Sequence, residues 1–281
     1  MSHPFFQLLV PPYVVGHRGA AGLAPENTLP SFECALACGA HALELDVHLT
    51  RDQQVIVTHD ARVDRVTNGS GPVASHTLEL LQDLDAGYRF TPDRGQTFPW
   101  RNQGVVLPTL DTVLTTFPDT PLIVEMKPDS LALAERLAAL LHVRKAAHRV
   151  LVGSFHDRIM HHFRQCAPTT ATAAGKAEAK RWVLRTHSGF PIRSPVPFQA
   201  LTVPPSRRGI PVITQRVCRT AHAQGLQIQV WTINQPDMMR ALYAKGVDGI
   251  TSDYPDRALA VAREIAATGT APVDRFSPIF R

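Results

Sequence analysis

Three short apolar runs between Val14 and Asp60 each end in ionisable side chains. The side chains at these ends are His17, Arg18, Glu44, Asp46, His59 and Asp60. Two histidines, an arginine and several carboxylates at the ends of β-type runs are hard to explain as packing residues. Carboxylates bind divalent cations, and histidine exchanges protons near neutral pH. The pattern therefore predicts a divalent-metal site flanked by two acid–base histidines, His17 and His59.

The segment 42–49 alternates between aliphatic residues at its odd positions and Glu44, Asp46 and His48 at its even positions. Alternation with a period of two is typical of a β-strand. In a surface strand the polar face would lie in water. Here the strand follows a β-helix unit, so both faces should be covered, and two acids that face inward need a cation. The segment thus favours a metal site over a solvated face.

Eight β-type runs alternate with helices along the chain. The runs are residues 13–15, 42–49, 122–126, 150–155, 170–174, 200–203, 227–233 and 249–252. The first helix has signals at both ends, with Thr28 as the N-cap and Gly39 as the stop. Eight such units over about 250 residues predict an α/β fold, the (β/α)₈ TIM barrel, whose active sites lie at the C-terminal ends of the strands.

Two features depart from regular alternation. The segment TRDQQ is too short for a helical crossover, so Val55–Val57 should return antiparallel to the preceding strand, and His59 should lie on this arm beside the barrel mouth. Residues 61–107 are irregular and predict a lid-like insertion after the second strand. Its aromatic residues either wall the pocket or pack the insertion against the barrel. They are Tyr88, Phe90, Phe98 and Trp100. We expect one domain over residues 1–281, with a core of about 13–267.

Composition limits the partners and the location. The net charge of +5 and pI near 9.3 suit a small anionic substrate, but without a dense Lys/Arg block we expect no nucleic-acid partner. No apolar run approaches the ~20 residues that span a bilayer, and the N-terminus lacks a basic region, so we expect neither a membrane anchor nor a signal peptide. Only 4 cysteines in 281 residues fit a reducing, cytoplasmic compartment. The sequence leaves the oligomeric state open.

Seven motifs resemble those of the glycerophosphodiester phosphodiesterase family. They are GHRGAAGLAPENT, ELDVHLTRD, VTHD, LPTLDTVL, IVEMK, VWTIN and GVDGITSD, and they run from about Val14 to Asp256 in the family's order and spacing. The resemblance implies a TIM barrel with one divalent cation. It also implies hydrolysis of glycerophosphodiesters, such as glycerophosphocholine and glycerophosphoethanolamine, to sn-glycerol 3-phosphate and an alcohol.

The resemblance also assigns expected roles to residues at matching positions. The metal ligands fall on Glu44, Asp46 and Glu125, the catalytic histidines on His17 and His59, the phosphate contacts on Arg18 and Lys127, and the pocket tryptophan on Trp231. Three carboxylates and no thiol favour Mg²⁺ or Ca²⁺ over Zn²⁺. The chain departs from the family at Gln53, where a glycine is usual in the hairpin turn, and residues 171–197 match no motif.

Two other functions fit the same motifs. Similar barrels cleave lysophospholipids in the manner of a phospholipase D, which requires an apolar groove for the acyl chain. A non-catalytic phosphate- or lipid-binding barrel would not need both histidines. The sequence leaves open which histidine is the base and which the acid. It equally leaves open whether water attacks directly or the glycerol 2-hydroxyl attacks first to form a cyclic phosphate.

Overall fold

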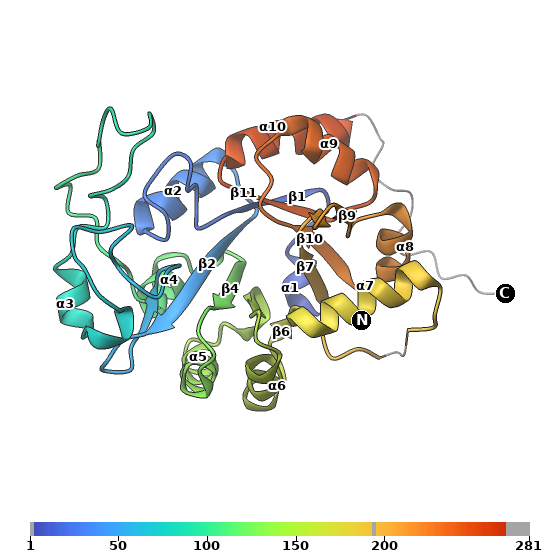
Figure 1. The fold of residues 1–281 in the computed structure, drawn as a ribbon, viewed down its shortest axis with the longest axis horizontal. Coiled ribbons are helices and arrows are strands. Elements are labelled where there is room, and N and C mark those ends of the chain that lie inside the picture. The colour runs from blue at the N-terminus through green and yellow to red at the C-terminus, as the bar shows by residue number, and fades with distance from the viewer. Residues whose placement is uncertain (1–2, 193–194, 268–281) are drawn as a thin grey trace.

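The computed structural model describes residues 3–192 and 195–267, and eight parallel strands form its centre (Figure 1). The sheet has the order β6-β5-β4-β2-β1-β11-β10-β7, and a parallel bridge between Ala173 and Ala200 joins its two ends. The sheet is therefore nearly closed into a barrel, which confirms the predicted TIM-barrel fold. The strands of this sheet are β1 (Tyr13–Gly16), β2 (Ala42–Leu49), β4 (Leu122–Met126), β5 (Val150–Gly153), β6 (Ala171–Thr172), β7 (Ala200–Val203), β10 (Gln227–Val230) and β11 (Gly249–Ser252).

Most of the helices surround the barrel, but the first closes one end of it and the third lies in the insertion after the second strand (Figure 1). The helices are α1 (Pro4–Gln7), α2 (Leu29–Cys38), α3 (Leu78–Gln82), α4 (Leu110–Thr116), α5 (Leu131–Val143), α6 (Asp157–Cys166), α7 (Lys176–Ser188), α8 (Gln215–Ala223), α9 (Pro236–Ala244) and α10 (Pro255–Ala267). The predicted ends of α2 are confirmed, because the Thr28 side chain accepts a hydrogen bond from the Ser31 amide and Gly39 has a φ of 100°. The described helices have at most 13 residues, and none is long and apolar enough to cross a membrane.

Some predicted boundaries were wrong. Strands β5, β6 and β10 are shorter than the apolar runs that contain them, because the chain leaves the ladder where it turns into the loops above the barrel. At the end of β5, for example, the Ser154 hydroxyl donates a hydrogen bond to the Met126 carbonyl. The sequence also did not predict α1 or the small hairpin of β8 (Ser206–Arg207) and β9 (Ile210–Pro211).

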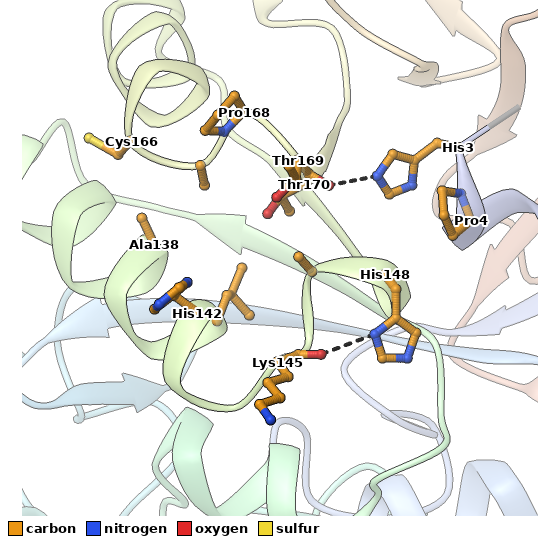
Figure 2. Close-up of a pocket in the computed structure, with 13 residues that line it drawn as sticks. His3, Pro4, Ala138, His142, Lys145, His148, Cys166, Pro168, Thr169 and Thr170 are labelled. Atoms are coloured by element: carbon orange, nitrogen blue, oxygen red, sulfur yellow. Dashed lines mark hydrogen bonds between the residues drawn. The ribbon is translucent and has the colours of Figure 1, made fainter. Parts of the chain in front are cut away.

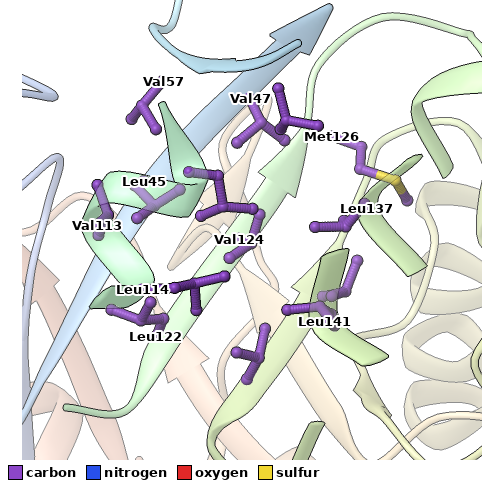
Figure 3. Packing of buried hydrophobic residues seen from close by; sticks show 14 of the residues in the cluster. Leu45, Val47, Val57, Val113, Leu114, Leu122, Val124, Met126, Leu137 and Leu141 are labelled. Carbon is purple, nitrogen blue, oxygen red and sulfur yellow. The ribbon is translucent and has the colours of Figure 1, made fainter. Parts of the chain in front are cut away.

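Aliphatic side chains on the outer face of the sheet pack against the helices (Figure 3). The aliphatic residues of β2 and β4 meet α4 and α5 in one buried cluster, which includes Leu45, Val47, Leu122, Val124, Met126, Val113, Leu114, Leu137 and Leu141. Burial of such side chains stabilises the fold by roughly 1.5–3 kcal/mol each. Because side chains alternate along a strand, the even-numbered residues of β2 must face the barrel interior.

The barrel interior is apolar at its N-terminal end and polar at its C-terminal end. The inward residues nearest the strand starts form a cluster with Phe5 and Phe6 of α1, which close this end of the barrel. They are Tyr13, Val15, Ala42, Ile123, Leu151, Ala171 and Ala200. The next inward positions along β1, β2 and β4 are His17, Glu44 and Glu125. The period of two thus places the ionisable residues together above an apolar floor.

The antiparallel arm is confirmed, since β3 (Val55–Val57) pairs antiparallel with the end of β2. The insertion that follows lies beside β2 and α4 (Figure 1). It has a small core of its own, against which Trp100 packs. The guanidinium of Arg101 stacks over Tyr88 and Phe98, with distances of 4.2 and 3.9 Å to the ring centroids. These contacts favour a packing role for the three aromatic residues over a pocket wall.

A groove of about 700 Å³ lies at the opposite end of the barrel from the ionisable cluster (Figure 2). Its lining residues come from the ends of α5 and α6, from the segments that precede β5 and β6 and from the segment that includes His3. The His3 and His148 rings both hydrogen-bond backbone carbonyls there, those of Thr169 and Lys145. The groove therefore contains structural histidines and none of the predicted site residues.

Candidate active site

Three carboxylates converge at the C-terminal end of the barrel. Glu44 and Asp46 lie on β2 and Glu125 on the adjacent β4, where Asp46 and Glu125 are partners in register. One oxygen atom from each carboxylate can be chosen so that all lie within 4.8 Å of one another. Glu44 is 8 % exposed and Asp46 is 1 % exposed. Strand pairing thus builds an oxygen-rich cluster that could hold a metal ion.

The electrostatics of this cluster fit a bound cation. Burial, together with the charges of Asp46 and Glu125, raises the pKa of Glu44 to about 8 against the opposing effects of His17 and Arg18. Burial and Asp46 also raise the pKa of Glu125, although Lys127 opposes them. Glu44 and Glu125 therefore resist ionisation, and a divalent cation would offset both their burial and the repulsion from neighbouring carboxylates. Three carboxylates, which are hard oxygen donors, are typical of Mg²⁺ and Ca²⁺ sites.

Two basic side chains lie against the carboxylates. The Lys127 ammonium is 3.0 Å from Glu125 Oε1 and 3.5 Å from Asp46 Oδ1. The Arg18 Nε is 3.3 Å from Asp46 Oδ2, and the Arg18 backbone amide donates a hydrogen bond to Glu44 Oε2. Burial lowers the pKa of Lys127, but Asp46 and Glu125 outweigh that effect and the pKa is raised overall. Both cations are therefore charged and placed where an anionic substrate group could reach them.

His17 follows β1 and is held by two residues from the far end of the chain. Its Nδ1 is 2.6 Å from Asp253 Oδ1, and Asn234 donates a hydrogen bond to the other oxygen of Asp253 at 2.6 Å. The Nε2 lies 4.0 Å from Glu44 Oε2 and 3.5 Å from the Thr232 hydroxyl. Burial lowers the pKa of His17, but the Asp253 hydrogen bond and the charge of Glu44 outweigh it and raise the pKa overall. The ring is thus oriented with Nε2 toward the cluster.

His59 follows the antiparallel arm and has a similar partner. Its Nδ1 is 2.6 Å from Asp60 Oδ1, and its backbone carbonyl is 3.0 Å from His48 Nε2. His59 is close enough to Glu125 to lower the pKa of that carboxyl. His17 therefore adjoins the cluster at Glu44, and His59 adjoins it at Glu125. The structure places a histidine–aspartate pair beside each of these two carboxylates.

The remaining predicted residue, Trp231, directly follows β10. Its ring lies edge-to-face with that of Phe155, with 5.7 Å between the centroids, and Phe155 is 46 % exposed. The Lys127 ammonium is 5.9 Å from the centroid of the Phe155 ring. An aromatic pair therefore lies beside the basic side of the cluster. All eight residues predicted from the sequence thus lie at the C-terminal end of the barrel.

Comparison with known proteins identifies the family. Residues 17–257 match the model of the glycerophosphoryl diester phosphodiesterase family, which covers the whole candidate site. The chain belongs to this family. It is 36 % identical over 252 residues to the putative glycerophosphodiester phosphodiesterase YhdW of Bacillus subtilis, and the match covers 87 % of this chain and 95 % of that protein. It is also 30 % identical over 260 residues to a glycerophosphodiester phosphodiesterase of Caldanaerobacter subterraneus, with 89 % and 98 % coverage. The chain is therefore a phosphodiesterase.

Solved structures of the family agree with the fold. A glycerophosphodiester phosphodiesterase from Agrobacterium tumefaciens matches with a TM-score of 0.70 at 28 % identity, over 88 % of this chain and 99 % of that chain. A phosphodiesterase from Oleispira antarctica, solved in complex with the product sn-glycerol-3-phosphate, matches with a TM-score of 0.71 at 26 % identity, over 91 % and 98 %. The family's barrel and the barrel described above are thus the same fold.

Sequence reasoning missed several polar partners in this phosphodiesterase. Asp253 ends the last strand as His17 ends the first, so the rule used for the other strand ends could have identified it. The buried Asn27 side chain donates a hydrogen bond to Asp46 Oδ2 at 2.9 Å. Arg65, whose guanidinium binds Asp60 and Glu26, could not be identified in this way, because it lies in the irregular insertion and at no strand end.

The raised pKa of Glu44 leads to a prediction about stability. Without metal, Glu44 titrates near its ordinary pKa in the unfolded chain but at about 8 in the folded protein. Between these values the folded state retains a proton that the unfolded state has lost, so the contribution of Glu44 becomes less favourable as the pH rises. We therefore expect Glu44→Gln to gain stability over the parent between pH 5 and pH 8, on the order of a few kcal/mol in the free energy of unfolding.

The measurement is denaturant unfolding of both proteins in chelator at pH 5, 6.5 and 8. A stability difference between the two proteins that does not change with pH would contradict this account of the cluster.

Proposed function

We propose that this phosphodiesterase hydrolyses glycerophosphodiesters, such as glycerophosphocholine and glycerophosphoethanolamine, to sn-glycerol 3-phosphate and an alcohol. The observation that carries the proposal is the buried carboxylate cluster with a histidine–aspartate pair on each side and two cations against it. The product complex of the Oleispira antarctica relative supports the same substrate class. A small anionic diester would match the positive side chains at the mouth of the barrel.

We assign the carboxylates of Glu44, Asp46 and Glu125 as ligands of one divalent cation, Mg²⁺ or Ca²⁺. Such a cation, when bound, neutralises phosphate oxygens and orients the phosphorus atom for attack. Arg18 and Lys127 would bind the same anionic group through charge-assisted hydrogen bonds. Trp231, with Phe155 against it, would form an apolar wall for the organic part of the substrate.

His17 and His59 would carry the proton transfers. Nδ1 of each ring is committed to an aspartate, so Nε2 of each is the nitrogen that can exchange a proton with substrate. One histidine would accept the proton of the nucleophile and the other would protonate the leaving alcohol, and each such transfer typically contributes ~10²–10⁴-fold. Either histidine can take either role. The nucleophile is water, or it is the glycerol 2-hydroxyl, in which case water then opens the resulting cyclic phosphate to give sn-glycerol 3-phosphate.

The test is a matrix of substrates and metals. Purified protein with Mg²⁺ or Ca²⁺ should release glycerol 3-phosphate from glycerophosphocholine or glycerophosphoethanolamine, measured by ³¹P NMR or a coupled assay. Faster cleavage of lysophosphatidylcholine would favour the lysophospholipase D function over ours. Binding of these diesters without turnover of any of them would indicate a non-catalytic barrel and overturn the proposal.

We further propose a single barrel domain with a core of about 13–267 and residues 61–107 as an insertion in it. The chain has only 4 cysteines in 281 residues, and Cys34, Cys38 and Cys166 form no disulfide, which supports a reducing, cytoplasmic location. We propose a small-molecule substrate and no nucleic-acid partner. Cell fractionation tests the location, and limited proteolysis, which should leave the core intact, tests the single domain.

A further inference from the structure

One side chain of the insertion connects the His59 pair to the Arg18 side of the site. Arg65 binds Asp60 with one edge of its guanidinium, through Nε to Oδ2 at 2.6 Å and Nη2 to Oδ1 at 3.2 Å. With the other edge it binds Glu26, through Nη1 to Oε2 and Nη2 to Oε1, both at 2.7 Å. Glu26 in turn accepts a hydrogen bond from Arg18 Nη1 at 2.8 Å. Four consecutive polar contacts thus lead from His59 to Arg18.

The His59 ring needs a contact from elsewhere in the fold, because the element that carries it is short. The strand that precedes it has three residues, and Asp60, its Nδ1 partner, is the next residue in the chain. A neighbour on the same loop cannot fix the ring relative to the barrel, since the two side chains can shift together. By contrast, His17 is held by Asp253 and Asn234, which lie on other strand ends of the barrel. His48 on β2 holds the backbone carbonyl of His59 but not its ring, and Arg65 connects the ring's partner Asp60 to Glu26, which lies outside this loop.

The anchor on the barrel side is Glu26, in the loop that enters α2. The Glu26 side chain is 18 % exposed, and its pKa is lowered because the hydrogen bonds and charges of Arg65 and Arg18 outweigh its burial. Glu26 therefore stays ionised between two arginines. The Arg65 side chain itself is 48 % exposed. Ion pairs this exposed contribute little to stability. The two bidentate contacts of Arg65 therefore indicate that it holds Asp60 and Glu26 in a fixed relative position.

We propose that Arg65 is a positioning residue that fixes the His59 imidazole relative to Arg18, by binding Asp60 and Glu26 at the same time. It touches no predicted ligand or proton-transfer atom, so it acts through His59. This inference rests on the proposed function for its kinetic consequence only. The insertion would thereby contribute to the active site, because its residue Arg65 holds the proton-transfer group His59 in place through Asp60.

Arg65→Gln and Arg65→Lys test the proposal, with Arg62→Gln as the matched control. Arg62 lies on the same insertion, where its side chain is 58 % exposed and pairs with Asp64 at 3.0 Å. We expect Arg65→Gln to lower kcat by about 10- to 100-fold with little change in Tm, because small misplacements of a catalytic group have effects of this size. A lysine cannot bind two carboxylates in bidentate fashion, so Arg65→Lys should restore little of the rate. Arg62→Gln should match the parent.

A double-mutant cycle identifies the route of the effect. If Arg65 acts through His59, then Arg65→Gln should not lower the residual rate of a His59→Ala protein any further. Multiplicative losses in the double variant would overturn the proposal. So would a parental kcat in Arg65→Lys, or a loss of kcat that only follows the loss of folded protein.

A measurement without turnover separates this inference from the proposed function. In two-bond ¹H–¹⁵N spectra of the parent, the ring assigned through His59→Ala should show a single tautomer with the proton on Nδ1. Arg65→Gln should give a mixture of tautomers, whereas Arg62→Gln should not. An unchanged His59 spectrum in Arg65→Gln overturns the positioning role. If no diester is cleaved by the parent, the proposed function fails, but this spectrum still decides the role of Arg65.

Discussion

Replacing His17 with alanine is expected to lower kcat by about 10³- to 10⁴-fold, with a much smaller change in KM. The reason is that His17 is the better fixed of the two histidines, with Nδ1 on Asp253 and Nε2 directed toward Glu44. Within the described part of the chain, no other imidazole lies within hydrogen-bond distance of Asp253 or Glu44. The loss of proton transfer should therefore appear in the chemical step. Steady-state kinetics on glycerophosphocholine at saturating metal measure this effect.

His187→Ala is the matched control, because His187 is exposed on α7 and should leave kcat unchanged. Asp253→Asn keeps the shape of the partner but removes its charge, so it should lower kcat less than the loss of the ring itself. A His17→Ala protein that is folded by circular dichroism and retains more than a tenth of the parental kcat would refute the catalytic assignment.

Removing the divalent cation is expected to abolish turnover and to lower the melting temperature. The carboxylates of Glu44, Asp46 and Glu125 lie together without enough positive charge to offset their repulsion, so a cation that binds only the folded state stabilises it. At a concentration 100 times its Kd, such an ion adds about 2.7 kcal/mol to the free energy of unfolding. We expect Mg²⁺ or Ca²⁺ to restore both activity and Tm after chelation, as shown by calorimetry and by initial rates.

Glu125→Gln should abolish the rise in Tm on metal addition together with most of the activity, since one of the three ligands has lost its charge. Glu33→Gln, at an exposed position on α2, should respond to metal as the parent does. Full activity of the parent in excess chelator would refute the metal site. A metal-induced rise in Tm that survives in Glu125→Gln would place the ion elsewhere.

Local patterns in the chain were sufficient to predict where the strands lie and to single out part of the candidate site. The period of two in β2 separates Glu44 and Asp46 from the aliphatic residues that pack under the helices, and the end of the first strand marks His17. Glu125 and Lys127 were assigned by the resemblance to the family. The short connection after β2 was sufficient to predict the antiparallel arm. These features depend on side-chain alternation and connection length, which are properties of a few consecutive residues.

Only the tertiary structure decided which distant residues meet. Glu125 joins Asp46 because β4 pairs with β2, and Asp253 reaches His17 because β11 pairs with β1 where the sheet curves into a barrel. Arg65 reaches Glu26 because the insertion folds back onto the loop before α2. The order of strands in a closed sheet and the path of an irregular insertion depend on packing over the whole domain. Local periodicity therefore placed the acids and bases at strand ends, and closure of the barrel selected their partners.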